Sequence, residues 1–230
     1  MNTFTKNKTA NDNNGVPTPK LGGAFADGLT LIRLILTPVI MFVIIKMGWP
    51  DVAPAVLASA LFIIAAITDF LDDITGGAKT SAHRQFGWFD DIADLVLIIG
   101  TLLALAYVIN RAGLMGWAFA IPASVIIGRE LIVGLIKGYD FSRHGWPSTK
   151  WLSLKNTLTF IAVCTLLAAP WLTGWVNSLT TDTADLMQVY GSNSAGVWIF
   201  AQGLLWIAAI ISLLTGIQLL RAPKSNDGID

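Results

Sequence analysis

Charged residues are scarce in this 230-residue chain. Asp, Glu, Lys and Arg make up 13% of the sequence, whereas 54% is hydrophobic and the mean hydropathy is +0.63. A soluble globular domain usually contains about 25% charged residues. The composition therefore excludes an ordinary soluble domain and predicts an all-α integral membrane protein with one membrane domain of several helices.

The chain also has only one cysteine, no net charge and no apolar stretch near its N-terminus. Cys164 is the single cysteine, so an intrachain disulfide is excluded. Basic and acidic residues number 15 each, and this balance gives no indication of a nucleic-acid partner. Residues 1–20 are polar without an apolar stretch, so we expect a disordered tail there and no cleaved signal peptide.

Long apolar runs, in contrast, are abundant. A spanning helix needs about 20 mostly apolar residues. Six segments meet this requirement: 28–46, 52–72, 87–109, 117–138, 153–172 and 196–220. We therefore predict a six-helix membrane domain over 21–221, followed by a C-terminal tail over 222–230. We expect 173–195, rich in Ser, Thr, Asn and Gly, to be the longest loop, and 17–26 is compatible with a short interfacial helix.

Lys and Arg are distributed unequally between the two predicted sides of the membrane. Only Lys46 and Arg111 lie on one side. The other side holds ten: Lys6, Lys8, Lys20, Lys79, Arg84, Lys137, Arg143, Lys150, Arg221 and Lys224. Because cytoplasmic loops carry the excess of basic residues, we predict a multi-pass inner-membrane protein with both termini in the cytoplasm.

Carboxylates gather where the second and third spans meet. The stretch 69–94 contains six aspartates: Asp69, Asp72, Asp73, Asp90, Asp91 and Asp94. Residues three or four apart share one face of a helix, so the first three lie together, as do Asp90 and Asp94. A tight turn would place the two spans side by side and bring both sets together at the cytoplasmic end.

Several close carboxylates cannot all stay ionised unless cations neutralise them. Mg²⁺ and Mn²⁺ prefer oxygen ligands, so we predict a site for two such ions. The four predicted ligands are Asp69, Asp72, Asp90 and Asp94. The alternative is that the aspartates are solvated at helix ends. Asp90 and Asp91 fit that alternative, because negative charge is favourable at a helix N-terminus, whereas Asp72 and Asp73 end a helix and do not.

The spacing of these aspartates resembles the signature of the CDP-alcohol phosphatidyltransferase family, D-x2-D-G-x2-A-R-x8-G-x3-D-x3-D. Asp69 and Asp72 match the first pair, and Asp90 and Asp94 match the second. Three further segments are similar to bacterial phosphatidylglycerophosphate synthases: LTLIRLILTP at 29–38, GRE at 128–130 and SLKNT at 153–157. The resemblance covers about residues 28–160 and agrees with a six-helix fold.

The resemblance implies a displacement at phosphorus, in which an acceptor alcohol attacks CDP-diacylglycerol and CMP leaves. It makes Asp94 the general base and the other three matched aspartates the main metal ligands. It also implies that the cytidine nucleotide lies near the segment 69–77. The candidate nucleotide-binding residues are Asp72, Asp73, Gly76, Gly77 and Lys79. This sequence departs from the pattern there, because Asp73, Gly76 and Gly77 stand where the family has Gly, Ala and Arg.

Cationic residues within the later spans point to a phosphorylated acceptor. Arg129 and Lys155 lie in or near apolar segments, and with Lys150 they are candidates to bind an acceptor phosphate. This favours sn-glycerol 3-phosphate, although Arg129 pairing with Glu130 is an alternative. Arg33 is expected to pair with the aspartate cluster.

Two other functions remain compatible with the sequence. One is a family member with another acceptor, such as a second phosphatidyl lipid in a cardiolipin-synthase-like reaction. The other is a non-catalytic metal-binding membrane protein or transporter. Membrane lipids are expected partners, and glycine-containing apolar faces would permit a homodimer.

Overall fold

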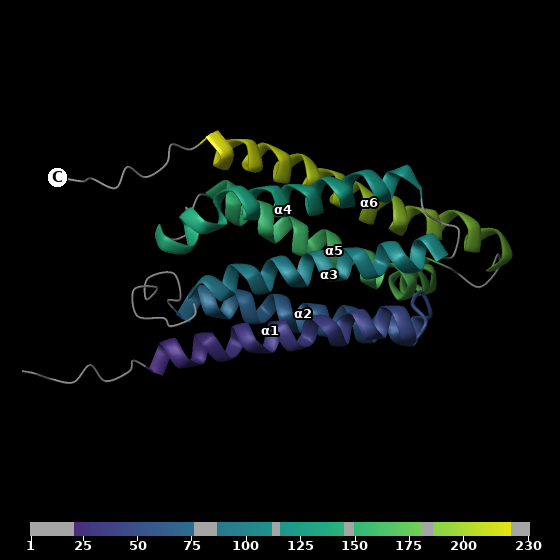
Figure 1. Cartoon of the computed structure of the whole chain (residues 1–230). Coiled ribbons are helices and arrows are strands. Elements are labelled where there is room, and N and C mark those ends of the chain that lie inside the picture. The colour runs from purple at the N-terminus through teal and green to yellow at the C-terminus, as the bar shows by residue number, and fades with distance from the viewer. Residues whose placement is uncertain (1–20, 76–86, 112–115, 145–149, 181–185, 222–230) are drawn as a thin grey trace, which may run out of the picture.

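Six long α-helices make up the part of the chain that the computed structural model describes, which is residues 21–75, 87–111, 116–144, 150–180 and 186–221 (Figure 1). They are α1 (Leu21–Lys46), α2 (Val52–Thr75), α3 (Gly87–Arg111), α4 (Trp117–His144), α5 (Lys150–Thr180) and α6 (Leu186–Arg221). Each contains a segment of 18 to 26 residues that is long and apolar enough to cross a membrane. The prediction of an all-α protein with six spans is confirmed.

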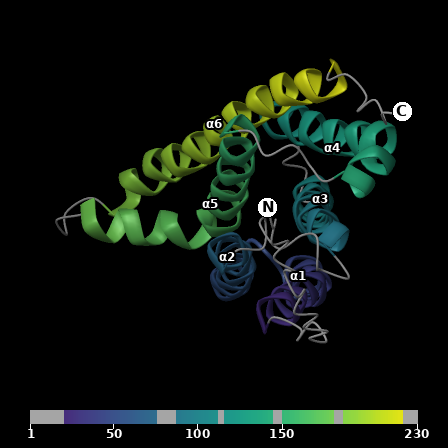
Figure 2. The same ribbon diagram turned by 90° about the vertical axis from the view of Figure 1, so that its left-hand side faces the viewer.

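The helices form two groups that α5 connects. α1 packs against α2 and α3, α4 packs against α6, and α5 lies between α2 and α6 (Figure 2). By contrast, α3 makes only sparse contacts with α4 and α5. The site described below includes a pocket between these three helices.

A stripe of small and apolar residues explains how α2 packs. Ala55, Ala58, Phe62 and Ala65 follow one another at intervals of three or four residues, and all are fully buried. Residues at this spacing share one helix face, and small side chains let membrane helices approach closely. Asp69 continues the same stripe by four residues, so the packing of α2 turns this aspartate toward the bundle interior.

Close approach between α1 and α3 depends on Gly100. A Cβ atom at Gly100 would lie 3.0 Å from Cγ2 of Thr37 and 3.1 Å from Sδ of Met41. Both distances are shorter than an ordinary van der Waals contact. The missing side chain of Gly100 therefore lets α1 and α3 come together, about two turns from Asp94 on α3.

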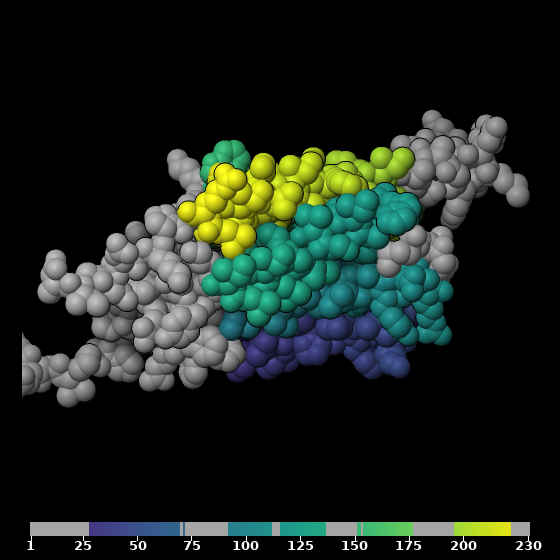
Figure 3. All heavy atoms as spheres, turned by 45° about the horizontal axis from the view of Figure 1, so that its top comes forward, coloured from purple at the N-terminus to yellow at the C-terminus, as the bar shows by residue number. Residues whose placement is uncertain are grey.

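Large apolar side chains cover the outside of the molecule. Leu135 is 84% exposed, Trp117 81% and Ile199 67%. α1, α3, α4 and α6 lie side by side along one flank (Figure 3). So much apolar surface is unfavourable in contact with water. We therefore expect these outward side chains to face lipid.

Two predictions about the ends of helices are wrong. The segment 173–195 is not a long loop, because α5 continues to Thr180 and α6 begins at Leu186. The Thr173 hydroxyl donates to the backbone oxygen of Ala169 at 2.8 Å, so this polar residue is satisfied within the helix and does not need a loop. Of the predicted interfacial helix, residues 21–26 belong to α1 without a break, and 17–20 lie outside the described residues.

Candidate functional site

Charged side chains inside the bundle gather at one end. Arg33 lies in the first half of α1, Asp69 in the last turns of α2, and Asp94 near the start of α3. Arg129 lies in α4, and Lys155 near the start of α5. Because successive helices run in opposite directions, these positions fall at the same end, where α1 begins and α6 ends (Figure 1).

Arg33, Asp69 and Asp94 form what we call the acidic group. Nη1 of Arg33 donates to Oδ1 of Asp69 at 2.9 Å and also to Oδ1 of Asp94. The Arg33 side chain is fully buried, and the two carboxylates are 22% and 16% exposed. The predicted pairing of Arg33 with the aspartate cluster is confirmed. One guanidinium therefore joins carboxylates from two other helices, α2 and α3.

The remaining predicted metal ligands, Asp72 and Asp90, and the predicted nucleotide-binding Asp73 are only partly placed. Asp72 and Asp73 belong to α2 and Asp90 to α3, but their side chains lie outside the described residues. Gly76, Gly77 and Lys79 lie entirely outside the described residues, so their predicted contacts with the nucleotide stay predictions.

The acidic group fits a divalent cation in its chemistry. Its donors are carboxylate oxygens, which Mg²⁺ and Mn²⁺ prefer, and Asp69 and Asp94 already converge on one positive charge. Among the side chains that the structure describes, no three metal-ligating residues of the types His, Cys, Asp and Glu gather at one point. The two-ion site therefore stays a prediction that involves Asp72 and Asp90.

Arg129, Glu130 and Lys155 form a second set, the basic group. Nη1 of Arg129 donates to Oε2 of Glu130 at 2.8 Å, and Nζ of Lys155 donates to Oε1 at 2.5 Å. The three side chains are 3%, 10% and 4% exposed. Within this group, one carboxylate hydrogen-bonds two cations, so the group has more positive than negative charge. The alternative pairing of Arg129 with Glu130 is present, and the side chain of Lys150 lies outside the described residues.

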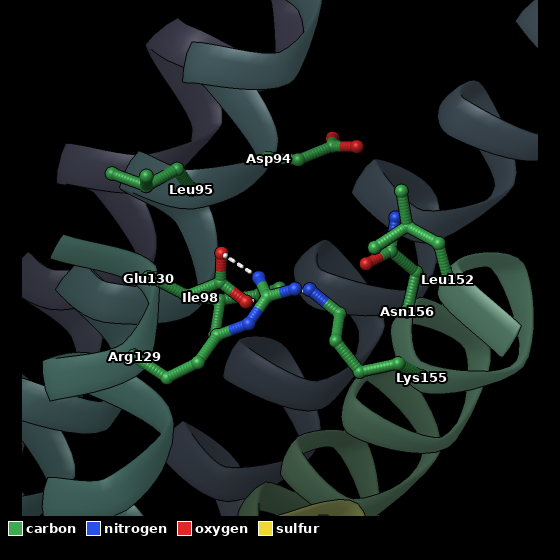
Figure 4. Close-up of a pocket in the computed structure, with 8 residues that line it drawn as sticks. All are labelled: Asp94, Leu95, Ile98, Arg129, Glu130, Leu152, Lys155 and Asn156. Atoms are coloured by element: carbon green, nitrogen blue, oxygen red, sulfur yellow. Dashed lines mark hydrogen bonds and ion pairs between the residues drawn. The ribbon is translucent and has the colours of Figure 1, made fainter. Parts of the chain in front are cut away.

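A pocket lies where α3 packs sparsely against α4 and α5. Its volume is about 50 Å³, and a single water needs only about 10–15 Å³ by this measure, so it has room for a small polar group. Eight residues line it: Asp94, Leu95, Ile98, Arg129, Glu130, Leu152, Lys155 and Asn156. The head groups of Arg129 and Lys155 point toward one another in this pocket, and Asp94 reaches it from α3 (Figure 4).

Comparison with known proteins identifies the family of this chain. The family model for CDP-alcohol phosphatidyltransferase matches residues 24–214, which is most of the chain and includes every residue of both charged groups. The chain belongs to the CDP-alcohol phosphatidyltransferase family. Its enzyme class is that of the family, a transferase of phospholipid biosynthesis in the membrane.

Curated relatives of this CDP-alcohol phosphatidyltransferase carry the name CDP-diacylglycerol–glycerol-3-phosphate 3-phosphatidyltransferase. The protein from Salmonella choleraesuis (strain SC-B67) is 27% identical over 201 residues, which is 86% of this chain and 93% of the relative. The protein from Escherichia coli (strain K12) is 25% identical over 202 residues, again 86% and 93%. These relatives are therefore similar along nearly their whole length.

Sequence reasoning missed three contributions to the basic group. Glu130 holds both cations at once, whereas the sequence indicated only its pairing with Arg129. Asn156 lines the pocket, and its position directly after Lys155 in the sequence could have indicated this. Oγ1 of Thr215 accepts a hydrogen bond from Nη2 of Arg129 at 3.4 Å, and nothing in the local sequence relates α6 to α4.

Proposed function

We propose that this enzyme transfers the phosphatidyl group of CDP-diacylglycerol to sn-glycerol 3-phosphate and releases CMP. The names of the relatives include both substrates. The observation that carries the proposal in this chain is the pocket, which joins Asp94 of the acidic group to Arg129 and Lys155 of the basic group. A phosphorylated alcohol needs both features, a base for its hydroxyl and cations for its phosphate.

The basic group supports an anionic acceptor by its charge. Glu130 neutralises only one of its two cationic neighbours, Arg129 and Lys155. An unmatched charge in a buried setting is unfavourable, so an anion that enters the pocket would be bound there. Guanidinium and ammonium groups form strong, charge-assisted hydrogen bonds with phosphate oxygens. A neutral alcohol would leave the positive charge unmatched.

In the proposed reaction, Asp94 accepts the proton of the acceptor hydroxyl as its oxygen attacks the β-phosphorus of CDP-diacylglycerol. A new P–O bond forms to the acceptor, the bond to CMP breaks, and CMP leaves with the bonding electrons. Arg33 orients the carboxylate of Asp94 through its shared ion pair. Arg129 and Lys155 hold the acceptor phosphate so that the hydroxyl remains near Asp94.

Four aspartates would hold the two divalent ions, Mg²⁺ or Mn²⁺: Asp69, Asp72, Asp90 and Asp94. When bound, such ions would neutralise pyrophosphate charge and stabilise the leaving phosphate. The convergence of Asp69 and Asp94 at one end of the bundle supports this assignment. We assign the nucleotide to the segment after Asp69, with the candidates Asp72, Asp73, Gly76, Gly77 and Lys79.

We also propose that the site faces the cytoplasm from the inner membrane, with both termini on that side. Support comes from the uneven distribution of Lys and Arg and from the bacterial relatives. The membrane domain would cover residues 21–221, with tails before and after it. A homodimer stays a prediction.

The test of this function is CMP release by the purified enzyme in detergent with CDP-diacylglycerol, Mg²⁺ or Mn²⁺, and glycerol 3-phosphate. We expect a phosphatidyl product with glycerol 3-phosphate and little with glycerol, which has the same hydroxyls but no phosphate. Faster reaction with glycerol or with a second phosphatidyl lipid would indicate a different acceptor. No CMP release with any of these would overturn the enzymatic assignment.

Asp94→Asn tests the proposed base. Removing a general base typically slows a reaction about 10²- to 10⁴-fold, so we expect kcat to fall by at least about 10²-fold. CDP-diacylglycerol binding should remain, because the other aspartates are intact. The matched control is Asp51→Asn, an exposed aspartate just before α2 at the other end of the bundle. Wild-type turnover by Asp94→Asn would contradict the assignment.

A further inference from the structure

The backbone of α6 at Gly216 lies closer to the side chain of Arg129 than is usual between packed helices. A Cβ atom at Gly216 would lie 2.8 Å from Cγ of Arg129, 3.2 Å from its Nε and 3.5 Å from its Cδ. The first distance is shorter than real side chains adopt. Cγ is close to the root of the arginine side chain, so it cannot swing away as the far end could. Only glycine at position 216 leaves room for Arg129 as it lies here.

Thr215 fixes the other edge of the same guanidinium. Its hydroxyl donates to the backbone oxygens of Ile211 and Ser212, at 2.9 and 3.0 Å. A hydroxyl has one proton and two acceptor lone pairs, so Oγ1 of Thr215 is left to accept from Nη2 of Arg129, at 3.4 Å. The orientation of this acceptor is therefore set within α6 itself.

These contacts determine which donors of Arg129 face the pocket. A guanidinium has five N–H groups in a fixed plane. One on Nη1 binds Glu130 and one on Nη2 binds Thr215, while Nε faces Gly216 and has no hydrogen-bond partner among the described residues. The other two N–H groups, one on each terminal nitrogen, remain for a ligand in the pocket that Arg129 lines.

We infer that Gly216 and Thr215 are positioning residues that set the affinity of this enzyme for its phosphorylated acceptor. The inference rests on the proposed phosphate-binding role of Arg129. Neither residue lines the pocket, and both act through the arginine. α6 thereby determines acceptor binding from a helix that carries no charged group of the site.

The test compares Gly216→Ala with Gly203→Ala, a change in the same helix where nothing lies within 4 Å of the new Cβ. We expect Gly216→Ala to raise the KM for glycerol 3-phosphate by about tenfold or more, because misplacing a binding group by about 1 Å can cost up to 10²-fold. The KM for CDP-diacylglycerol should be unchanged in both variants. A general structural defect would instead affect both substrates.

Thr215→Val provides an independent measurement without added bulk in the contact. We expect it to raise the acceptor KM about threefold to tenfold, the effect of one lost hydrogen bond, and Thr215→Ser should restore the wild-type value. If Gly216→Ala fails to fold, this pair of variants decides the question. Equal KM values for Thr215→Val, Thr215→Ser and the wild type would overturn the inference.

Arg129→Gln separates this inference from the proposed function. If Arg129→Gln raises the acceptor KM and the α6 variants do not, the positioning role is wrong while the function stands. If Arg129→Gln leaves the acceptor KM unchanged, the phosphate-binding role of Arg129 is wrong, and the inference is overturned with it.

Discussion

Arg33 and Glu130 have opposite roles at the level of single residues. Arg33 is one cation between two carboxylates, and Glu130 is one carboxylate between two cations. Each is buried, and each holds side chains from different helices in place. Carboxylates predominate in one group and cations in the other, and Asp94 brings the two groups together at the pocket.

The first prediction concerns Arg33. Arg33→Met would leave Asp69 and Asp94 facing each other without their shared cation, and loss of one partner from a buried ion pair typically costs about 3–5 kcal/mol. We expect the free energy of unfolding to fall by about that amount, measured by thermal or denaturant unfolding in detergent.

The matched control is Arg111→Met, an exposed arginine at the other end of α3, where surface substitutions usually change stability by less than about 0.5 kcal/mol. Adding Mg²⁺ should stabilise Arg33→Met more than the wild type, because the variant has lost a positive charge beside Asp69 and Asp94. If both arginine variants were equally stable, the buried ion pair would not contribute to stability.

Sequence alone could predict the acidic group better than the basic one. Arg33 is a charge in an apolar span, and carboxylates at neighbouring helix ends are its natural partners, so its pairing followed from position and charge. The hydrogen bond between Lys155 and Glu130 joins residues 25 positions apart on different helices. Its geometry depends on how α4 and α5 cross, which the composition of neither helix determines.

At the level of elements, the approach of α1 to α3 is controlled by Gly100. Gly100→Leu would force a branched side chain against Thr37 and Met41, which already lie within about 3 Å of the position of a Cβ atom. Overpacking of a tight core typically costs about 1–3 kcal/mol. We expect that loss of unfolding free energy, together with reduced turnover because Arg33 and Asp94 lie on the separated helices.

Gly174→Leu is the matched control, because nothing lies within 4 Å of a Cβ atom at this exposed position in α5. Both variants add the same side chain to a helix in place of glycine. Leu has a higher helix propensity than Gly, so a similar loss of stability in the two variants would indicate a general effect of the added side chain and not the α1–α3 contact.

Helix ends were the least predictable part of the fold. Apolar runs located all six helices, but α5 and α6 extend well into a segment rich in Ser, Thr, Asn and Gly. Hydroxyl side chains can satisfy themselves on the backbone of the preceding turn, as Thr173 and Thr165 do. Polarity alone therefore did not distinguish a loop from a helix that continues beyond its most apolar part.

At the level of the whole molecule, the charged groups and both ends of the helical domain lie at the same end of the bundle. We predict that this end faces the cytoplasm. In a Cys164→Ala background, a cysteine at Arg221→Cys should react with a membrane-impermeant thiol reagent only after the inner membrane is opened.

The control for orientation is Arg111→Cys at the opposite end, which should react in cells with an intact inner membrane. Both arginines are exposed at the ends of their helices, so the two cysteines should be similarly accessible to the reagent. The reverse labelling pattern would place the site on the periplasmic side and contradict the distribution of Lys and Arg.

The ion pair of Arg33 also has a consequence for how the protein enters the membrane during synthesis. α1 is made first, but the carboxylates that match its arginine arrive only with α2 and α3. An unpaired arginine costs about 2.5–3.5 kcal/mol at the centre of a span, and less toward its end. Arg33 lies five residues from the start of the apolar segment Gly28–Lys46. α1 can therefore enter the membrane with its arginine near the lipid headgroups, and the ion pairs with Asp69 and Asp94 form once α2 and α3 are synthesised.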